Sequence, residues 1–261
     1  MLPTLVKRGP VAVHSYGVML MLGFIAGMLA ARRQADRLRL PRELALDLGL
    51  WVLVGSVAGA RLLFAALNWW SFRGDPMEVL YLWRVPGLSF HGGLLGGLLA
   101  GLLLARTRQV SFWALADLAA PGIALGYGIT RIGCFLNGCC YGSPTSLPWG
   151  VRFPVYPDSP LLTDPSHPVQ LYSALGSFAI FAALLWARPR LAARGQLFLL
   201  WAVLYAALRA GMEVLRKGYT AEPLWHGAPI TQGQLASAVM LALGLIGFIR
   251  RGRRSGEGDA V

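Results

Sequence analysis

The sequence predicts an all-α integral membrane protein, a bundle of about seven transmembrane helices with its N-terminus outside and its C-terminus in the cytoplasm. Three observations lead to this prediction. Hydrophobic residues make up 56% of the 261-residue chain and charged residues only 14%, and the mean hydropathy is +0.54, which does not suit a soluble domain. Apolar segments of about 20 residues, long enough to cross about 30 Å of hydrocarbon, recur along the chain. Basic residues are concentrated in alternate connections.

The apolar segments define the helices in order. The first follows Lys7 and Arg8 and is itself followed directly by arginines, so we interpret it as a membrane anchor and not as a cleaved signal peptide. Because no polar segment is long enough for a soluble domain, we predict a single polytopic membrane domain over residues 1–261. The predicted spans are residues 14–33, 44–67, 88–105, 112–132, 169–187, 195–215 and 231–249.

The distribution of charge predicts the orientation. About twice as many basic residues follow the first, third, fifth and seventh spans as lie on the other side of the membrane. The positive-inside rule therefore places the N-terminus outside and the C-terminus in the cytoplasm. The net charge of +12 is explained by this topology, so we expect no nucleic-acid partner.

Two polar segments and several glycines complete the organisation. Residues 133–168 are rich in Pro, Gly, Ser and Thr, and we interpret them as an ordered external loop or cap. Residues 250–261, RRGRRSGEGDAV, are predicted to form a disordered basic tail near anionic headgroups in the cytoplasm. Glycines four residues apart in the second, third and fourth spans should allow these helices to approach closely.

Besides the two arginines that end the first span, three arginines lie within the predicted spans, where an ionisable side chain costs about 2.5–3.5 kcal/mol on insertion scales. Arg61, Arg131 and Arg209 all fall in the outer halves of their spans. Tyr205, Arg209 and Glu213 are four residues apart and so share one helix face. Arg209 and Glu213 can form a structural ion pair, but a single nearby carboxylate cannot balance the positive charge of three arginines. An anionic ligand such as a phospholipid phosphate would balance it, because Arg can donate two hydrogen bonds to a phosphate.

Other polar residues open spans from the same side. His91, in SFHGGLLGG, is a candidate general base, since histidine exchanges protons readily near neutral pH; the alternative is a solvated interfacial histidine. Tyr16 opens the first span, where aromatic residues are common in any case. Gln170 opens the fifth span. All these groups lie at one level near the outer surface.

All three cysteines lie in TRIGCFLNGCCYG, residues 130–142. A structural zinc site uses four ligands, with spacings such as CxxC, whereas this stretch offers three cysteines, two of them adjacent. His91 or His167 could supply a fourth ligand, but we predict no metal. A disulfide between Cys134 and Cys139 is an alternative in an oxidising compartment, and the spacing leaves the pairing open.

The same stretch resembles the signature of the prolipoprotein diacylglyceryl transferases, which runs roughly Gly-Arg-x-Gly-Asn-Phe-x-Asn-x-Glu and closes on a Gly. The similarity continues through HSYG, FHGGLLGG, HPVQLY, YAALRAGMEVLR and GQLAS, in the family's order. It implies a multi-pass protein of the bacterial inner membrane that transfers diacylglyceryl from phosphatidylglycerol to the lipobox cysteine of a prolipoprotein. Glycerol phosphate is released, and no cofactor is implied.

The resemblance also implies roles for individual residues. Arg131 and Arg209 would hold the donor's headgroup and stabilise the departing phosphate. His91 matches the histidine proposed as base for the incoming thiol, and Tyr16 matches an essential tyrosine. The predicted substrate-binding set comprises Arg131, Asn137, Gly142, Tyr205 and Glu213, which match the family, together with Arg61 and Gln170.

The chain departs from the family's pattern at four positions. In the signature, Cys134 replaces an Asn, Cys139 replaces a Glu and Thr130 replaces a Gly, and in the sixth span Ala210 replaces an aromatic residue. Our main prediction is the family's transfer reaction. One alternative is a divergent member with another acceptor or with thiol redox chemistry. A non-enzymatic lipid or anion transporter ranks last, because the inner halves of the spans carry few polar residues.

Overall fold

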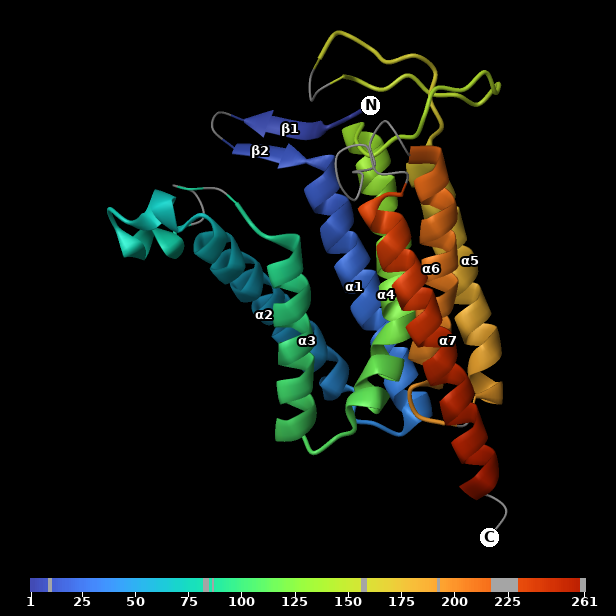
Figure 1. Cartoon of the computed structure of the whole chain (residues 1–261). Coiled ribbons are helices and arrows are strands. Elements are labelled where there is room, and N and C mark those ends of the chain that lie inside the picture. The colour runs from blue at the N-terminus through green and yellow to red at the C-terminus, as the bar shows by residue number, and fades with distance from the viewer. Residues whose placement is uncertain are drawn as a thin grey trace. The chain divides into compact units, whose positions relative to one another are not determined.

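The computed structural model describes residues 1–8, 11–81, 85, 87–155, 159–191, 193–216 and 230–258. Within these residues, seven helices are long and apolar enough to cross a membrane (Figure 1), which confirms the predicted fold class. They are α1 (Ser15–Leu38), α2 (Glu43–Leu67), α3 (Phe90–Thr107), α4 (Phe112–Asn137), α5 (Val169–Ala187), α6 (Gln196–Arg216) and α7 (Gln232–Gly258). Short 3-10 helices occupy Trp69–Phe72 (η1), Pro76–Val79 (η2) and Arg188–Arg190 (η3).

Three helices continue beyond the predicted spans. Helix α1 continues through ARRQADRL, whose Ala, Arg and Gln residues favour helix without being apolar. Helix α4 reaches Asn137, so the long connection begins five residues later than predicted. Helix α7 includes residues 250–258 of the predicted disordered tail. Hydropathy detects the part of a helix that lies in lipid, whereas the backbone hydrogen bonds continue into the aqueous interface.

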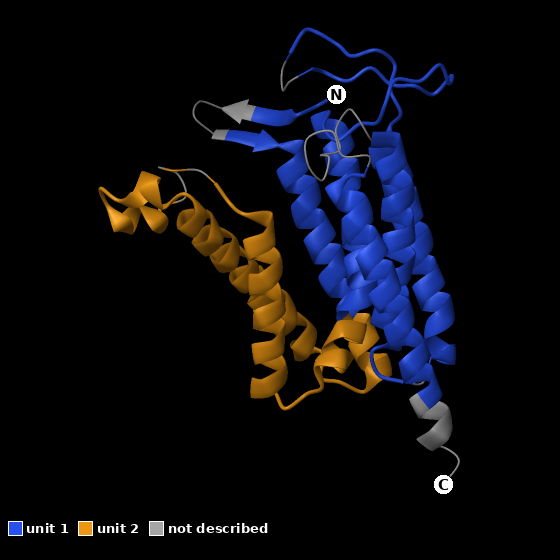
Figure 2. Cartoon of the chain, in the orientation of Figure 1, with its two compact units in different colours: residues 1–31, 119–261 blue, residues 32–118 orange. Residues whose placement is uncertain are grey.

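The chain divides into two compact units (Figure 2). The first contains residues 1–31 and 119–261, and the second contains residues 32–118. The second unit is built on close packing between α2 and α3. A Cβ atom added at Gly55 or Gly59 would collide with the backbone of Gly96, and the reverse is also true, so the predicted close approach of these helices is confirmed.

The first unit has its core between α4, α5 and α6. Ala120, Ala124, Ile180, Leu184 and Leu197 form a buried apolar cluster there. Small residues also bring α1 onto α4. A Cβ atom at Gly122 or Gly126 would meet the backbone of Gly27 or Gly23 on α1, so the predicted glycine contact on α4 has α1 as its partner.

A short hairpin precedes α1, and the sequence analysis did not predict it. Strand β1 (Thr4–Arg8) pairs antiparallel with β2 (Val11–His14). The backbone N–H of Leu2 donates to the carbonyl of Leu136 at 3.0 Å, which ties the hairpin to the end of α4. Strands of four or five residues leave no signal in a window sized for membrane helices.

The connection between α4 and α5 contains no helix in the parts that the structure describes, residues 138–155 and 159–168. Isolated bridges hold it together, and they join Pro144 to Ser166, Val151 to Ser166, and Pro154 to Leu162. It is thus an ordered loop, and Phe153 is fully buried within it.

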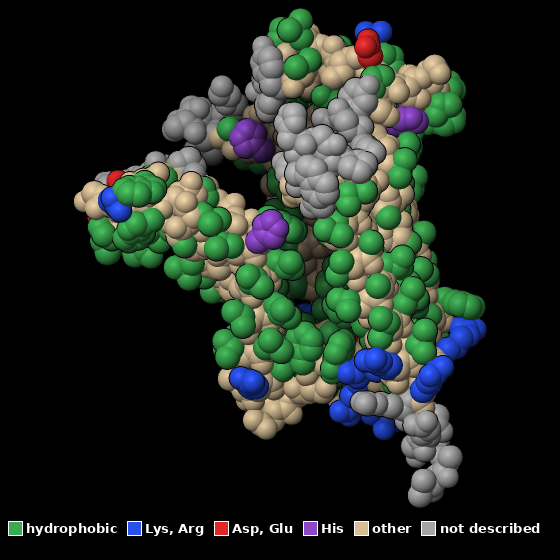
Figure 3. Space-filling model, in the orientation of Figure 1, with side chains coloured by type: hydrophobic (Ala, Val, Ile, Leu, Met, Phe, Trp, Pro, Cys, Tyr) green, Lys and Arg blue, Asp and Glu red, His purple; other side chains and the backbone are tan. Residues whose placement is uncertain are grey.

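The outer faces of the helices are apolar. On α7, Leu235, Val239, Leu243 and Ile246 follow one face and are between 43% and 64% exposed. Figure 3 shows hydrophobic side chains along the sides of the helices, and Lys and Arg side chains gathered where α7 ends. An apolar surface of this extent is expected to face lipid.

Candidate active site

Arg131 lies on α4, six residues before the helix ends. Its guanidinium carbon is 4.7 Å from the centre of the Tyr127 ring, and Tyr127 packs edge-on against Tyr205 of α6 at 5.2 Å between ring centres. The buried Nε of Arg131 has no hydrogen-bond partner among the residues that the structure describes. A guanidinium that lies over an aromatic ring and has a hydrogen-bond donor left over can bind an anion.

A second cationic group lies on α6. Glu213, only 2% exposed, forms ion pairs with Arg209 at 2.5 Å and with Arg216 at 3.7 Å. The Thr231 hydroxyl donates to the other carboxylate oxygen at 2.9 Å. The predicted ion pair between Arg209 and Glu213 is therefore present. Glu213 thus pairs with two arginines, and Arg209, with a side chain 24% exposed, is the more accessible of the two.

Gly233 allows α7 to reach this ion pair. A Cβ atom there would collide with the Glu213 carboxylate and come within 3.0 Å of an Arg209 nitrogen. Tyr205 interacts electrostatically with both Arg131 and Arg209, so the two cationic groups belong to one site on α4, α6 and α7.

The signature stretch turns sharply where α4 ends. Gly138 has a φ of +77°, its N–H donates to Phe135 O at 3.1 Å, and the N–H of Cys139 donates to Cys134 O at 3.2 Å. These two bonds define a Schellman motif, which Asn137-Gly138 favours because glycine adopts the left-handed region freely. Cys140 has a φ of +62°, which is unusual for a non-glycine residue and makes a second reversal two residues after the first.

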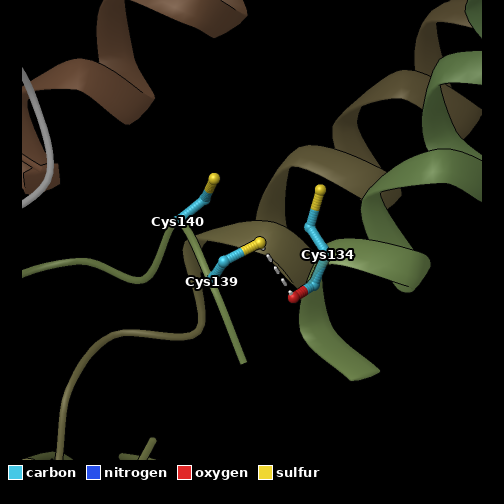
Figure 4. A group of neighbouring side chains, drawn as sticks. All are labelled: Cys134, Cys139 and Cys140. Atoms are coloured by element: carbon cyan, nitrogen blue, oxygen red, sulfur yellow. Dashed lines mark hydrogen bonds between the residues drawn. The ribbon is translucent and has the colours of Figure 1, made fainter. Parts of the chain in front are cut away.

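These reversals bring the three thiols together. Cys134, Cys139 and Cys140 are all free, and their sulfur atoms lie within 4.8 Å of one another. Figure 4 shows Cys134 on the last turn of α4, with the Cys139 thiol directed at the carbonyl of Cys134, 3.7 Å away. Hydrogen bonds from the Cys134 and Cys139 thiols lower the pKa of Cys140 from its usual range, and the positive charges of Arg131 and Arg216 act in the same direction.

Gln170 and Gly142 attach this loop to the helices. The Gln170 amide nitrogen, from a side chain 1% exposed, donates to Cys139 O at 2.6 Å. A Cβ atom at Gly142 would come within 2.8 Å of the carbonyl oxygen of Leu215 and within 2.6 Å of Val169, so only glycine fits without a shift. Both residues position the signature loop. Asn137, predicted with them, hydrogen-bonds the Cys139 side chain.

Tyr16 is the second residue of α1 and is 38% exposed. Its backbone packs on the glycine face of α4, since a Cβ atom at Gly133 would lie 3.4 Å from the Tyr16 Cα. Its side chain interacts electrostatically with Arg131 and with all three thiols. The tight contact between α1 and α4 therefore brings Tyr16 to the site.

His91 and Arg61 belong to the second unit. His91 is exposed as the second residue of α3, and its ring packs edge-on against Phe90 at 5.7 Å. The preceding Ser89 caps this helix with a hydrogen bond from the Gly92 N–H at 3.5 Å. An exposed imidazole at a helix start is available to a substrate.

Arg61 has an environment that the sequence analysis did not predict. It is 6% exposed, and its guanidinium donates to five backbone carbonyls at 2.6–3.3 Å. The acceptors are Glu78, Val79, Tyr81, Val85 and Gly87. A guanidinium has five N–H donors, so none remains for a headgroup, and the geometry gives Arg61 a structural role in place of the predicted substrate contact.

The structure thus brings most of the predicted residues into the first unit. They are Tyr16, Arg131, Asn137, Gly142, Gln170, Tyr205, Arg209 and Glu213. The sequence analysis missed Tyr127, Thr231 and Gly233. Tyr127 is four residues before Arg131, and this spacing could have identified it. No sequence signal pointed to Thr231 and Gly233, because their role arises from the packing of α7 on α6.

These features define a multi-pass membrane protein with a cationic, partly buried site at one end of its helices. Residues 3–250 match the family model described as prolipoprotein diacylglyceryl transferase. The chain therefore belongs to the prolipoprotein diacylglyceryl transferase family, a family of transferase enzymes, as the sequence resemblance indicated.

Curated relatives cover almost the whole chain, and each carries the name phosphatidylglycerol–prolipoprotein diacylglyceryl transferase. The protein of Nostoc sp. (strain PCC 7120) is 33% identical over 94% of this chain and 88% of its own length. The protein of Gloeobacter violaceus is 35% identical over 99% of this chain and 96% of its own. The protein of Bordetella avium is 36% identical over 97% and 96%, respectively.

Proposed function

We propose that this protein transfers the diacylglyceryl group of phosphatidylglycerol to the thiol of the lipobox cysteine in a prolipoprotein. The observation that carries the proposal is Arg131, a membrane arginine with an unpaired buried donor beside a second cationic group on α6. A buried guanidinium donor within the spans favours an anion as its partner, and the lipid phosphate is the anion that a membrane supplies. Family membership supports the same donor and acceptor.

The reaction exchanges one bond to carbon for another. The acceptor thiol gives up its proton, its sulfur forms a bond to the diacylglyceryl carbon, and the bond from that carbon to the phosphate oxygen breaks. Glycerol phosphate leaves with the electron pair. Arg131 and Arg209 stabilise the charge that develops on the leaving oxygen, and no redox cofactor is required.

The remaining residues have supporting roles in this proposal. His91 accepts the thiol proton. Tyr16 orients the lipid headgroup, Tyr205 interacts electrostatically with both arginines, and Glu213 orients Arg209 through their ion pair. Asn137, Gly142 and Gln170 hold the loop after α4 in the shape that the substrates meet.

We further propose that the protein lies in the bacterial inner membrane as one polytopic domain, with the N-terminus and residues 138–168 outside and the C-terminus in the cytoplasm. The bias of basic residues toward alternate connections supports this orientation. The gathering of basic side chains where α7 ends agrees with it (Figure 3). Substrates would then enter from the outer leaflet, where prolipoproteins emerge.

To test the proposed transfer, the purified protein is incubated in detergent with phosphatidylglycerol and a lipobox peptide. We expect the peptide to gain the mass of a diacylglyceryl group while glycerol phosphate is released. Arg131→Ala should reduce the rate at least 100-fold, because the main stabiliser of the leaving group is lost. Arg42→Ala, which removes an exposed ion pair with Asp36, should not change the rate. Absence of a mass gain with folded protein and bound lipid would overturn the proposal.

A further inference from the structure

The three cysteines form a cluster that the transfer reaction does not use. Their sulfur atoms approach within 4.8 Å of one another, although Cys139 and Cys140 are adjacent in sequence. The left-handed backbone at Cys140 makes this possible, and such a conformation costs about 1–2 kcal/mol in a non-glycine residue. Three converging thiols held at this cost require an explanation beyond loop packing.

We propose that Cys134, Cys139 and Cys140 bind one Zn(II) ion, and that the fourth position of this ion receives the acceptor thiol. The second half of the proposal rests on the proposed function. It also revises the prediction of no metal, which relied on the spacing of ligands along the chain. Adjacent cysteines are poor ligands for one ion in a helix or strand, but the reversal at Cys140 removes this obstacle.

The geometry suits a thiophilic ion. A tetrahedral zinc site with Zn–S bonds of about 2.3 Å places its sulfur atoms about 3.8 Å apart. The three thiols therefore need to close by at most about 1 Å, which side-chain rotation can supply. They belong to the only group of three or more potential metal ligands found in the described part of the chain. Three protein ligands and one open position are typical of a catalytic zinc site.

The surroundings also suit the bound ion. Three thiolates and one Zn(II) carry a net charge of −1, and Arg131 and Arg216 both interact electrostatically with Cys140. Asn137 hydrogen-bonds the Cys139 side chain, while the buried Gln170 holds the Cys139 carbonyl at 2.6 Å. Such outer contacts commonly orient metal ligands.

Bound zinc would promote the first step of the transfer, which is deprotonation of the acceptor thiol. When the acceptor thiol binds, its S–H bond breaks, the proton passes to a base, and a Zn–S bond forms. The bound thiolate then attacks the diacylglyceryl carbon, and the carbon–oxygen bond to phosphate breaks. Arg131, close to the cluster, neutralises the departing phosphate. The metal changes no oxidation state, so no redox partner is required.

Metal binding is tested first, without phospholipid substrate. The full-length protein is reduced with a phosphine, mixed with one equivalent of Zn²⁺, passed through a desalting column and analysed for zinc by mass spectrometry. We expect one zinc per chain, and at least a 10-fold loss of affinity in each of Cys134→Ser, Cys139→Ser and Cys140→Ser. His167→Ala is the matched control and should bind zinc normally. Absence of zinc, equal binding by the serine variants, or a disulfide in the unreduced protein would overturn the site.

The open position is tested with cobalt. Co²⁺ in a thiolate site gives sulfur-to-metal charge-transfer absorption, which should change when a lipobox peptide is added and stay unchanged with its Cys-to-Ser peptide. An unchanged spectrum with both peptides would overturn thiol binding. Removal of zinc by a chelator should also lower diacylglyceryl transfer at least 10-fold, and full activity of the zinc-free protein would overturn the catalytic role. Because the first two measurements need no transfer, they remain decisive if the proposed function fails.

Discussion

At the scale of single residues, Glu213 balances the positive charge of two arginines. It is almost fully buried and pairs with both Arg209 and Arg216, while Thr231 satisfies its other oxygen. A buried carboxylate between two arginines is strongly coupled to them, because loss of the carboxylate leaves two cations close together in a partly dry environment.

Glu213→Ala should therefore destabilise the protein by about 3–5 kcal/mol and reduce transfer. Thr231→Val removes only one hydrogen bond to the same carboxylate and should cost about 1–2 kcal/mol. Thermal unfolding in detergent measures both changes. Equal stability of the two variants would show that the ion pairs contribute little.

Arg61 has a structural role that can be separated from catalysis. Lysine has three donors and cannot reproduce five hydrogen bonds to the loop carbonyls. Arg61→Lys should lower the unfolding temperature and expose residues 68–81 to proteolysis. Arg131→Lys should leave both unchanged and slow transfer instead. If Arg61→Lys weakens phosphatidylglycerol binding without any loss of stability, the predicted substrate-binding role is restored.

At the scale of helices, glycine contacts position side chains of the candidate site. Gly133 allows Tyr16 to pack closely on α4, and Gly233 allows α7 to pack closely on the ion pair of Glu213. A pattern of glycines in the sequence predicts that helices approach closely, but it does not identify the partner. Gly122 and Gly126 were predicted to aid packing, and only the structure reveals α1 as the helix that they contact.

Gly233→Ala should displace the Glu213 carboxylate, because the added methyl group would overlap it. We expect loss of about 1–3 kcal/mol of stability and a lower transfer rate. Gly211→Ala on α6 is the matched control: no atom lies within 4 Å of its added Cβ, so it should be neutral or stabilising by up to about 1 kcal/mol. Equal behaviour of the two variants would remove the proposed role of Gly233.

The sequence predicts elements that depend on local composition, and it does not predict contacts between distant residues. Membrane helices are detectable because the bilayer imposes a length and an apolar composition on each of them. The β1–β2 hairpin, the five carbonyls around Arg61 and the convergence of Cys134, Cys139 and Cys140 depend on turns and on distant contacts. Spacing along the chain did not predict that the three thiols converge, because their positions depend on the turns at Gly138 and Cys140.

At the scale of the whole molecule, the proposed roles belong to residues of different compact units. Arg131 and Arg209, which we propose to bind the phosphate, belong to the first unit, and His91, the proposed base, belongs to the second. Changes at these residues should affect different steps. Arg131→Ala should weaken phosphatidylglycerol binding and slow transfer, whereas His91→Ala should slow transfer alone.

His91→Ala should reduce the transfer rate about 100-fold, within the range that a general base contributes, while lipid binding stays unchanged. Added imidazole should restore part of the rate, because it replaces the missing ring without changing the fold. His167→Ala, in which the lost histidine lies in the first unit beside Tyr172, should be active and insensitive to imidazole. Full activity of His91→Ala would instead assign proton removal to another group, and activation by zinc at the cysteine cluster would then be sufficient.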